Sequence, residues 1–435
     1  MFDKIIPQKS NKQGDISDIL FYSFIEYQKE LGYPDYKNSL INNFQNRIII
    51  YSRYSNILNV IDYFYSKFCL LIQKYNRGEK LKKKIFLFNL KHRFIIWDRK
   101  KYSMGLFVHG LQDRIFAIFN TVPYVSYADL YELIFRFYTQ NDEQEIFKLI
   151  EQLSERLLIV KPDYVILPDD SIPIERTIVY VCKKLKIPTI VIQHGIYQSK
   201  IKYFDGMAAD YVLVWGQYFK DQYVRFGKNP ERIYIIGYPN KHKIRSSKRF
   251  GLPTRIKLYY LGQCIESLNP EYLGQKIKTI QKLNDFCRMN NIDFFYRPHP
   301  KDDIILLKKH LLNIEFTSLS ESLEDSVIKG DIFISFNSTA LIEASMNSKI
   351  CLQLMDYPLE TDNYEKLGVC MRSFKNIGDL EIYLTKLIIS DNIFNIRPKF
   401  NEEYINISYD PKSRFSEIIS QIEKIESPIQ HTLFN

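Results

Sequence analysis

The sequence predicts an α/β protein made of two doubly wound domains, each with a parallel sheet. Short apolar runs alternate with amphipathic helical stretches along most of the chain, which is typical of βαβ units. The alternation is interrupted at Lys241–Pro253, a basic and polar segment that we interpret as a linker. A chain of 435 residues is also too long for one ordinary core. We therefore expect two Rossmann-like domains that face each other across a cleft.

The expected boundaries follow from where the apolar pattern changes period. Residues 1–80 form a helical N-terminal region, 81–245 the first domain, 254–400 the second domain, and 401–435 a helix returning over the first domain and then a tail. The expected strands are Lys84–Phe88, Leu106–His109, Asp163–Leu167, Pro188–Gln193, Tyr211–Trp215, Tyr234–Ile236, Ile256–Leu261, Ile292–Tyr296, Ile332–Ser335 and Ile350–Gln353. The expected helices include Ile19–Leu31, Ile57–Ile72, Asp129–Tyr138, Gln144–Leu158, Ile174–Lys184, Gln217–Phe226, Lys276–Met289, Ile304–Leu311, Ser338–Met346 and Ile377–Ile389.

Charge and cysteine usage narrow the classes of partner. The net charge is +10, from 60 Lys and Arg against 50 Asp and Glu, which fits nucleic acid, an anionic membrane surface or a phosphorylated substrate. The basic residues are scattered and no nucleic-acid motif is present, so we expect no nucleic-acid partner. Six isolated cysteines indicate reduced thiols of a cytoplasmic protein. No apolar run is long enough to span a bilayer, and peripheral contact with the inner membrane stays open.

The most informative stretch ends a strand of the second domain. Ile292–Tyr296 is followed by Arg297, Pro298, His299 and Pro300, and the two prolines force the chain out of the sheet. His299 is therefore presented at the carboxyl end of a parallel strand, where α/β sheets bind ligands. An arginine and a histidine there suit a phosphate, because both donate and the histidine can also pass a proton. The alternative is a proline-capped strand end with a surface histidine.

A second anion-binding pattern follows the strand that ends at Ser335. Asn337, Ser338 and Thr339 lead directly into a helix, and the N-terminus of a helix attracts anions. We expect this helix start and His299 to hold one phosphate from neighbouring strands, although simple capping is the alternative. Glu343, one turn into the helix, can accept from ribose hydroxyls or face solvent. Gly262 and Gln263, after the first strand of this domain, mark a further place where a diphosphate can approach.

The first domain carries two candidate sites for a general base. Asp169 and Asp170 follow a buried strand directly, and one of them can deprotonate a hydroxyl nucleophile. The alternative is that Asp170 or Ser171 caps the next helix. His194 ends the following strand and is a rival base. Its neighbours Gln193, Gly195 and Tyr197 belong to the expected acceptor side, where Gly195 lets the backbone approach a ligand.

Several nucleotide-binding signatures are missing. The sequence has no Walker A run and no GxGxxG fingerprint, which argues against ATPases and dehydrogenases. No DxD triplet stands at a strand end, so we expect no metal. A pair of glutamates eight residues apart, following the phosphate site, is also missing, which disfavours retaining nucleotide-sugar transferases.

The motif set resembles that of bacterial GT-B transferases of capsule and surface polysaccharide biosynthesis. Arg297–Pro300 followed by the Ser/Asn/Ser/Thr helix start is similar to the HP and S/T motifs of sialyl- and polysialyltransferases, Kdo transferases and CDP-glycerol glycerophosphotransferases. Asp169 and Asp170 are similar to the acidic pair of bacterial sialyltransferases, with Ser171 where that family has glycine. Gln193–Gly195 resembles the histidine loop of glycerophosphotransferases and of capsule biosynthesis proteins.

The resemblance implies an inverting, metal-independent glycosyltransferase. It implies a CMP-activated sugar as donor, a nonulosonate or Kdo, and a glycan or lipid-linked oligosaccharide as acceptor. Arg297 and His299 are then expected on the donor phosphate, and Asp169, Asp170 or His194 as the base. No cofactor is expected beyond the nucleotide-sugar itself. The alternatives are a glycerophosphotransferase, a UDP-GlcNAc 2-epimerase-like isomerase and a non-catalytic binding module.

Overall fold

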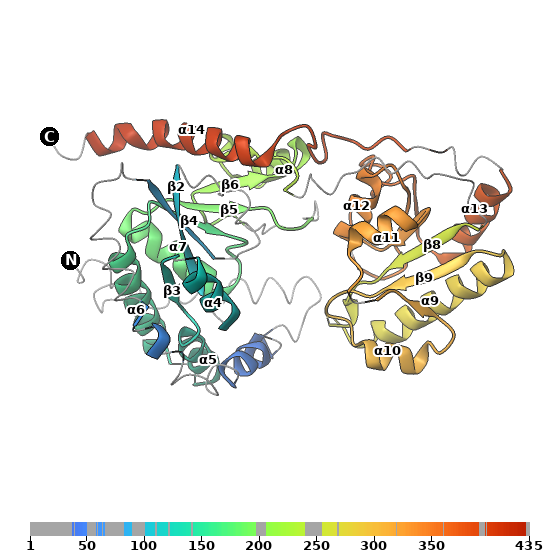
Figure 1. Cartoon of the computed structure of the whole chain (residues 1–435), viewed down its shortest axis with the longest axis horizontal. Coiled ribbons are helices and arrows are strands. Elements are labelled where there is room, and N and C mark those ends of the chain that lie inside the picture. The colour runs from blue at the N-terminus through green and yellow to red at the C-terminus, as the bar shows by residue number, and fades with distance from the viewer. Residues whose placement is uncertain are drawn as a thin grey trace.

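The structure is a computed structural model of the whole chain (Figure 1). The described residues are 37–38, 40–49, 58, 60–62, 64–65, 82–88, 101–108, 111–120, 122–140, 142–196, 206–239, 255–267, 269–318, 320–359, 361–390, 396 and 398–431. The expected helix Ile19–Leu31, the linker Lys241–Pro253 and the candidate Tyr197 lie outside them, as does most of Ile57–Ile72.

The first domain is built on a seven-stranded sheet whose strands are all parallel. Its order is β3-β2-β1-β4-β5-β6-β7. The chain therefore starts in the middle, moves outward through β2 and β3, and reverses direction between β1 and β4. The strands are β1 (Lys83–Leu87), β2 (Tyr102–Val108), β3 (Tyr124–Ser126), β4 (Tyr164–Leu167), β5 (Thr189–Ile192), β6 (Tyr211–Val214) and β7 (Ile233–Ile235).

Helices cover this sheet and connect its strands. They are α4 (Leu111–Phe119), α5 (Leu130–Gln140), α6 (Gln144–Val160), α7 (Pro173–Leu185) and α8 (Gln217–Arg225), with a short 3-10 turn η4 (Pro230–Arg232). The C-terminal helix α14 (Pro411–His431) runs back over the first domain (Figure 1). Its Phe415 ring lies 6.0 Å from the ring of Tyr102. Helix α4 and strand β3 were not predicted.

The second domain has a six-stranded parallel sheet in the order β10-β9-β8-β11-β12-β13. The direction reverses between β8 and β11. The expectation that His299 and the Ser338 helix start follow neighbouring strands is wrong, because β8 lies between β9 and β11. The strands are β8 (Lys257–Leu261), β9 (Asp293–Arg297), β10 (Glu315–Phe316), β11 (Ile332–Ser335), β12 (Ile350–Leu354) and β13 (Arg372–Phe374).

The helices of the second domain follow the expected alternation. They are α9 (Tyr272–Met289), α10 (Ile304–His310), α11 (Leu323–Lys329), α12 (Thr339–Met346) and α13 (Ile377–Ile389), with a 3-10 turn η6 (Ile265–Ser267). Helix α11 was not predicted, although Ser322 and Asp325 form a capping box at its start. Strands β10 and β13 are too short to show an apolar period. The two-domain α/β architecture predicted from the sequence is confirmed.

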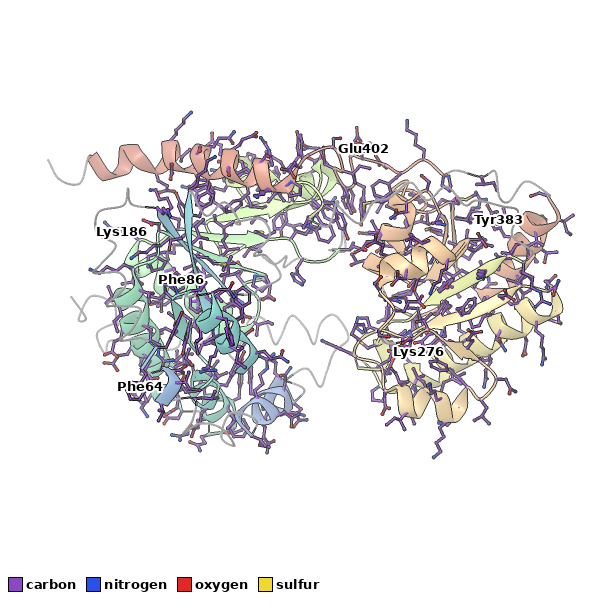
Figure 2. All side chains as sticks on the ribbon, viewed as in Figure 1. Phe64, Phe86, Lys186, Lys276, Tyr383 and Glu402 are labelled. Atoms are coloured by element: carbon purple, nitrogen blue, oxygen red, sulfur yellow. The ribbon has the colours of Figure 1, made fainter. Side chains whose placement is uncertain are left out.

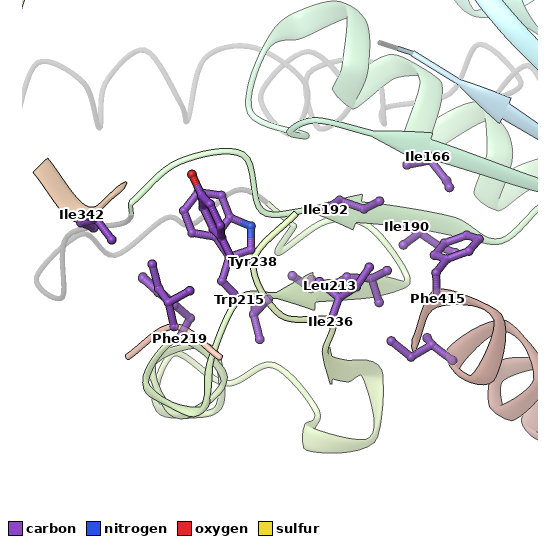
Figure 3. Packing of buried hydrophobic residues seen from close by; sticks show 14 of the residues in the cluster. Ile166, Ile190, Ile192, Leu213, Trp215, Phe219, Ile236, Tyr238, Ile342 and Phe415 are labelled. Carbon is purple, nitrogen blue, oxygen red and sulfur yellow. The ribbon is translucent and has the colours of Figure 1, made fainter. Parts of the chain in front are cut away.

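One hydrophobic cluster joins the two domains at the carboxyl ends of their strands. Trp215 and Tyr238 of the first domain share it with Ile342 of α12 (Figure 3). Tyr238, just after β7, donates its hydroxyl to Glu343 Oε1 at 2.5 Å. Because these groups follow β7 and β11, the carboxyl edges of the two sheets meet. This is the arrangement that places two loop sets around a shared ligand.

A segment before α14 ties the domains together on the same side. Asn401 donates its backbone N–H to Gly368 O in the second domain at 3.1 Å. Five residues later, Asn406 exchanges backbone hydrogen bonds with Trp215 and Tyr238 of the first domain, both 2.9 Å long. Between them Tyr404 is completely buried. The chain crosses from one domain to the other in this stretch, so it limits how far they can separate.

Most of the described cysteines lie in the core. Cys182, Cys287, Cys351 and Cys370 are buried, and Cys264 is half-buried. None of the helices in the described part of the chain has the length and apolar character that a membrane crossing requires.

Candidate active site

The reversal point of the second sheet is bridged by two amide side chains. Gln263 follows β8 and Asn337 follows β11. Gln263 Oε1 accepts from the backbone N–H of Asn337 at 3.0 Å, and Gln263 Nε2 donates to Asn337 Oδ1. Open α/β sheets bind ligands at such a reversal point. The paired amides fix the separation of the two loops.

Helix α12 begins at this point and is capped by Ser338. The Ser338 hydroxyl accepts from Ala340 N at 3.1 Å. The first N–H groups of a helix have no partner within it, so the start at Thr339 can donate to an anion. Ser335 lies deeper: it is fully buried and donates to Leu261 O at 2.9 Å, which suits a structural role. Glu343 contacts Tyr238, so it joins the domains in this state of the molecule.

Gly262 is needed because two loops come very close. A Cβ at this position would lie 2.3 Å from the hydroxyl of Tyr296 and 3.0 Å from the carbonyl oxygen of Arg297. Its N–H donates to that same carbonyl at 2.8 Å. Gly262 therefore allows the β8 loop to lie against the end of β9.

His299 is held in one tautomer by its own turn. Its Nδ1 accepts from the backbone N–H of Lys301 at 3.2 Å. An amide nitrogen can only donate here, so the neutral ring carries its proton on Nε2. Partial burial lowers the pKa of His299 below its usual range, and the nearby Asp302 partly offsets this. The ring is thus neutral near pH 7 and offers an Nε2–H donor.

The guanidinium of Arg297 is already engaged inside the second domain. It donates to the Ser326 hydroxyl at 2.8 Å and to the carbonyl oxygen of Glu321 at 3.0 Å. Desolvation lowers the pKa of Arg297. These contacts join the end of β9 to the start of α11. In this arrangement Arg297 shapes the loop, while His299 is the donor that its turn presents.

A lysine is buried beneath the second-domain loops, and the sequence did not predict its role there. Lys276, labelled in Figure 2, belongs to α9 and is 1% exposed. Its ammonium donates to Asp302 Oδ1 at 2.8 Å, to both oxygens of Glu266 at 2.9 and 3.0 Å, and to the carbonyl oxygen of Gln263 at 2.9 Å. A lysine in an amphipathic helix usually faces solvent, so nothing local signalled its burial.

The acidic pair of the first domain is divided between two environments. Asp170 is buried, and its oxygens accept from the backbone N–H groups of Gly206, Ala208 and Ala209 at 2.6, 2.8 and 2.8 Å. Burial raises the pKa of Asp170, and these bonds oppose the rise. With both oxygens engaged, Asp170 is placed as an anchor of the loop that precedes β6 rather than as a base.

Asp169 makes weaker contacts at the start of α7. Its Oδ1 accepts from Ser171 N at 3.3 Å and from Ile172 N at 3.4 Å. Burial raises the pKa of Asp169; His194 lowers it and the charge of Asp170 raises it. The charge of His194 acts on Asp169, so Asp169 is the carboxylate of the pair that interacts electrostatically with the candidate histidine.

His194 is exposed at the carboxyl edge of the first sheet, in a tautomer opposite to that of His299. Its Nδ1 lies 2.8 Å from the carbonyl oxygen of Pro168. A carbonyl can only accept, so Nδ1 carries the proton and the lone pair of the neutral ring is on Nε2. Pro168 follows β4 and His194 follows β5, which are adjacent strands. The backbone of one strand end thus orients the ring of the next.

Two described candidates on the acceptor side remain, Gln193 and Gly195. Gln193 is fully buried; its Nε2 donates to Gly195 O and its Oε1 accepts from Trp215 N, both at 2.8 Å. It braces the ends of β5 and β6. Within the described part of the chain, no heavy atom would lie within 4 Å of a Cβ on Gly195.

No metal cluster is formed by the part of the chain described above: no three His, Cys, Asp or Glu side chains there are placed to share an ion. Besides the carboxylates described above, the polar groups at the two sheet edges include amides and imidazoles. Such groups bind and orient a phosphate and exchange protons.

Comparison with solved structures identifies the fold as GT-B. A putative UDP-N-acetylglucosamine 2-epimerase from Listeria monocytogenes aligns with a TM-score of 0.54 at 13% identity, covering 79% of this chain and 96% of that one. The UDP-GlcNAc 2-epimerase from Neisseria meningitidis bound to UDP-GlcNAc aligns with a TM-score of 0.51 at 13% identity, covering 79% and 100%. A glycosyltransferase from Rickettsia africae aligns with a TM-score of 0.51 at 10% identity, covering 80% and 99%.

No protein-family model and no curated protein matches the chain. Identities this low establish the fold alone.

Proposed function

We propose that the chain is an inverting, metal-independent glycosyltransferase of surface polysaccharide biosynthesis. It acts in the cytoplasm on a nucleotide-activated sugar, with a glycan or lipid-linked oligosaccharide as acceptor. The observation that carries the proposal is the pair of opposite histidine tautomers. His194 offers a lone pair on the first domain, and His299 offers a donor on the second.

The proposed reaction uses each nitrogen once. His194 Nε2 removes the proton of the acceptor hydroxyl while that oxygen forms a bond to the anomeric carbon. The bond from that carbon to the phosphate oxygen breaks, and the electron pair leaves with the nucleotide. The imidazolium formed at His194 is stabilised by the Asp169 carboxylate beside it. His194 is thus favoured as the base over Asp169 and Asp170.

The leaving phosphate is proposed to sit at the start of α12. The Nε2–H of His299 and the first N–H groups of the helix donate to its oxygens, and the helix dipole favours its charge. Ser338 and Thr339 form this start, and Gln263 pairs with Asn337 just before it. These donors stand in for the metal that other transferases use to neutralise a diphosphate.

The donor nucleotide is proposed to be CMP-linked, because the HP and S/T motifs resemble those of transferases that use cytidine-activated donors. The Neisseria meningitidis structure contains UDP-GlcNAc instead. A thermal-shift panel of CMP, CDP, UDP and GDP separates these donors. A ligand at 100 times its dissociation constant adds about 2.7 kcal/mol to the free energy of unfolding. A shift with CMP and none with UDP supports the proposal, and the reverse result removes it.

A nucleotide-sugar 2-epimerase is the second candidate, favoured by the fold similarity to the two epimerases. An epimerase converts its substrate without any acceptor, whereas a transferase requires one. Incubating the protein with the activated sugar alone, and analysing the products by chromatography, therefore distinguishes them. An epimerised nucleotide-sugar would replace the transferase assignment. Glycerol phosphate transfer from CDP-glycerol is tested in the same way with an added acceptor.

A further inference from the structure

The turn that carries His299 is fastened from below by one buried carboxylate. Asp302 Oδ2 accepts from the backbone N–H of His299 at 2.8 Å and from the hydroxyl of Tyr296 at 2.6 Å. Its other oxygen accepts from Lys276 Nζ at 2.8 Å. The side chain of Asp302 is 0% exposed. Three donors therefore meet one carboxylate, with the ammonium on one side and the turn on the other.

The same lysine connects this turn to the loop after β8. Lys276 Nζ also binds Glu266 and the carbonyl oxygen of Gln263, the residue that pairs with Asn337 across the reversal point. The loops after β8, β9 and β11 are thus linked through a chain of contacts that begins at one ammonium. Such a link fixes the loops relative to one another before any ligand arrives.

The geometry of this turn determines which nitrogen of His299 carries the proton. Asp302 N donates back to His299 O at 2.9 Å, closing the turn. The closed turn aims the N–H of Lys301 at His299 Nδ1. We propose that Asp302, held by Lys276, is a positioning residue that sets the tautomer of His299 and so presents its Nε2–H to the donor phosphate. The phosphate as ligand rests on the proposed function; the tautomer does not.

Asparagine is the informative replacement at position 302. An amide has one accepting and one donating end, whereas the native carboxylate accepts on both sides. In Asp302→Asn, an oxygen turned to Lys276 leaves the NH₂ facing the N–H of His299, and the opposite orientation sets the NH₂ against the ammonium. Either way one side loses its contact. The first orientation keeps the buried lysine satisfied, so we expect the turn to open.

The test is the protonation of His299 in the full-length protein, read by long-range ¹H–¹⁵N NMR on histidine-labelled samples at about pH 8, above the usual histidine pKa of about 6.5. The chain has only seven histidines, and His299→Gln assigns the signal by its disappearance. In the wild type we expect Nε2 protonated and Nδ1 bare. In Asp302→Asn we expect a mixture of the two His299 tautomers. We also expect the dissociation constant for CMP to rise about tenfold, and the turnover of the variant to change less.

Glu266→Gln is the matched control, because it removes an equal charge from Lys276 without touching the turn. It should leave the tautomer unchanged. A wild-type His299 protonated on Nδ1, or an unchanged tautomer in folded Asp302→Asn, would overturn the proposal. So would an equal change in Glu266→Gln. If Asp302→Asn does not fold, the wild-type spectrum still tests which nitrogen of His299 carries the proton. Loss of CMP binding in every sample, with the tautomer as expected, would instead count against the proposed function.

Discussion

The two histidines show how equivalent positions acquire different chemistry. His194 and His299 each stand two residues beyond a parallel strand, one in each domain. The backbone group nearest Nδ1 is a carbonyl in the first domain and an amide N–H in the second. The first therefore leaves a lone pair on Nε2, and the second leaves a donor. Strand position brings a histidine to the ligand edge, and the neighbouring backbone decides what it does there.

The carboxylates of the two edges differ in the same way. In the first domain the Asp170 carboxylate accepts hydrogen bonds from backbone N–H groups of one loop. In the second, Asp302 and Glu266 share a buried lysine that links two loops. The first edge thus keeps one exposed histidine ring that interacts electrostatically with a carboxylate, which suits proton transfer. The second is cross-linked beforehand, which suits binding of a charged group.

The largest expected effect comes from removing the lone pair of the first edge. His194→Gln should lower turnover by about 10³-fold, because loss of a general base typically costs 10² to 10⁴. The binding of CMP should be unchanged, since His194 belongs to the acceptor side. Steady-state rates and nucleotide titrations on the same samples measure both. Turnover within a few-fold of wild type would exclude His194 as the base.

Replacing the two adjacent aspartates should separate an anchor from a catalytic neighbour. Asp170→Asn places an NH₂ among the N–H groups of Gly206, Ala208 and Ala209, and should lower the free energy of unfolding by about 3 kcal/mol. Asp169→Asn is the control and should cost less than about 1 kcal/mol, because its bonds are long. Urea unfolding measures both. A fully stable but inactive Asp170→Asn protein would instead favour Asp170 as the base.

Removing the donor of the second edge should affect binding as well as rate. His299→Ala should lower turnover by at least about 10²-fold, equivalent to about 2.7 kcal/mol of transition-state stabilisation. His299→Ala should also weaken nucleotide binding, whereas His194→Gln should leave it unchanged. The control is unchanged thermal unfolding without ligand. Near-normal turnover in a folded His299→Ala protein would remove His299 from the mechanism.

The smallest expected effect is a pH dependence of stability from the same residue. Burial lowers the pKa of His299 below 6.5, so the unfolded chain binds more protons than the folded one as the pH falls through that value. Stability that is present above about pH 6.5 is therefore lost on acidification. His299→Gln should flatten this loss by a fraction of a kcal/mol, because the ring is only half-buried. Equal slopes for both proteins between pH 7 and 5 would contradict the assigned burial.

The predicted fold is confirmed in its strands of four or more residues, whereas three strands of two or three residues and the helices α4 and α11 were not predicted. Strands such as β4, β9 and β11 begin and end within about a residue of the expected positions. Strand β10 has two residues and β13 has three, which is too few for alternation to be visible. The order of strands was also misjudged: β9 and β11 are separated by β8, because position within a parallel sheet depends on crossovers that local patterns do not encode.

For the candidate site, the sequence predicts which residues lie at strand ends but not which groups they contact. The residues that follow strand ends, such as Asp169, His194, His299 and Ser338, were identifiable because strand ends can be read from sequence. Their hydrogen-bond partners were not, and these decide the roles. The three N–H groups on Asp170 and the burial of Lys276 arise from tertiary packing between distant segments. A polar residue predicted at a strand end can therefore be a brace, as Gln193 and Ser335 are placed here.

The division of labour between the two edges is tested most directly by nucleotide binding to the two histidine variants. Thermal unfolding of wild type, His194→Gln and His299→Ala is followed with and without saturating CMP. We predict that CMP stabilises the wild type and His194→Gln equally, and stabilises His299→Ala much less. Stabilisation that is lost in His194→Gln and kept in His299→Ala would contradict the account.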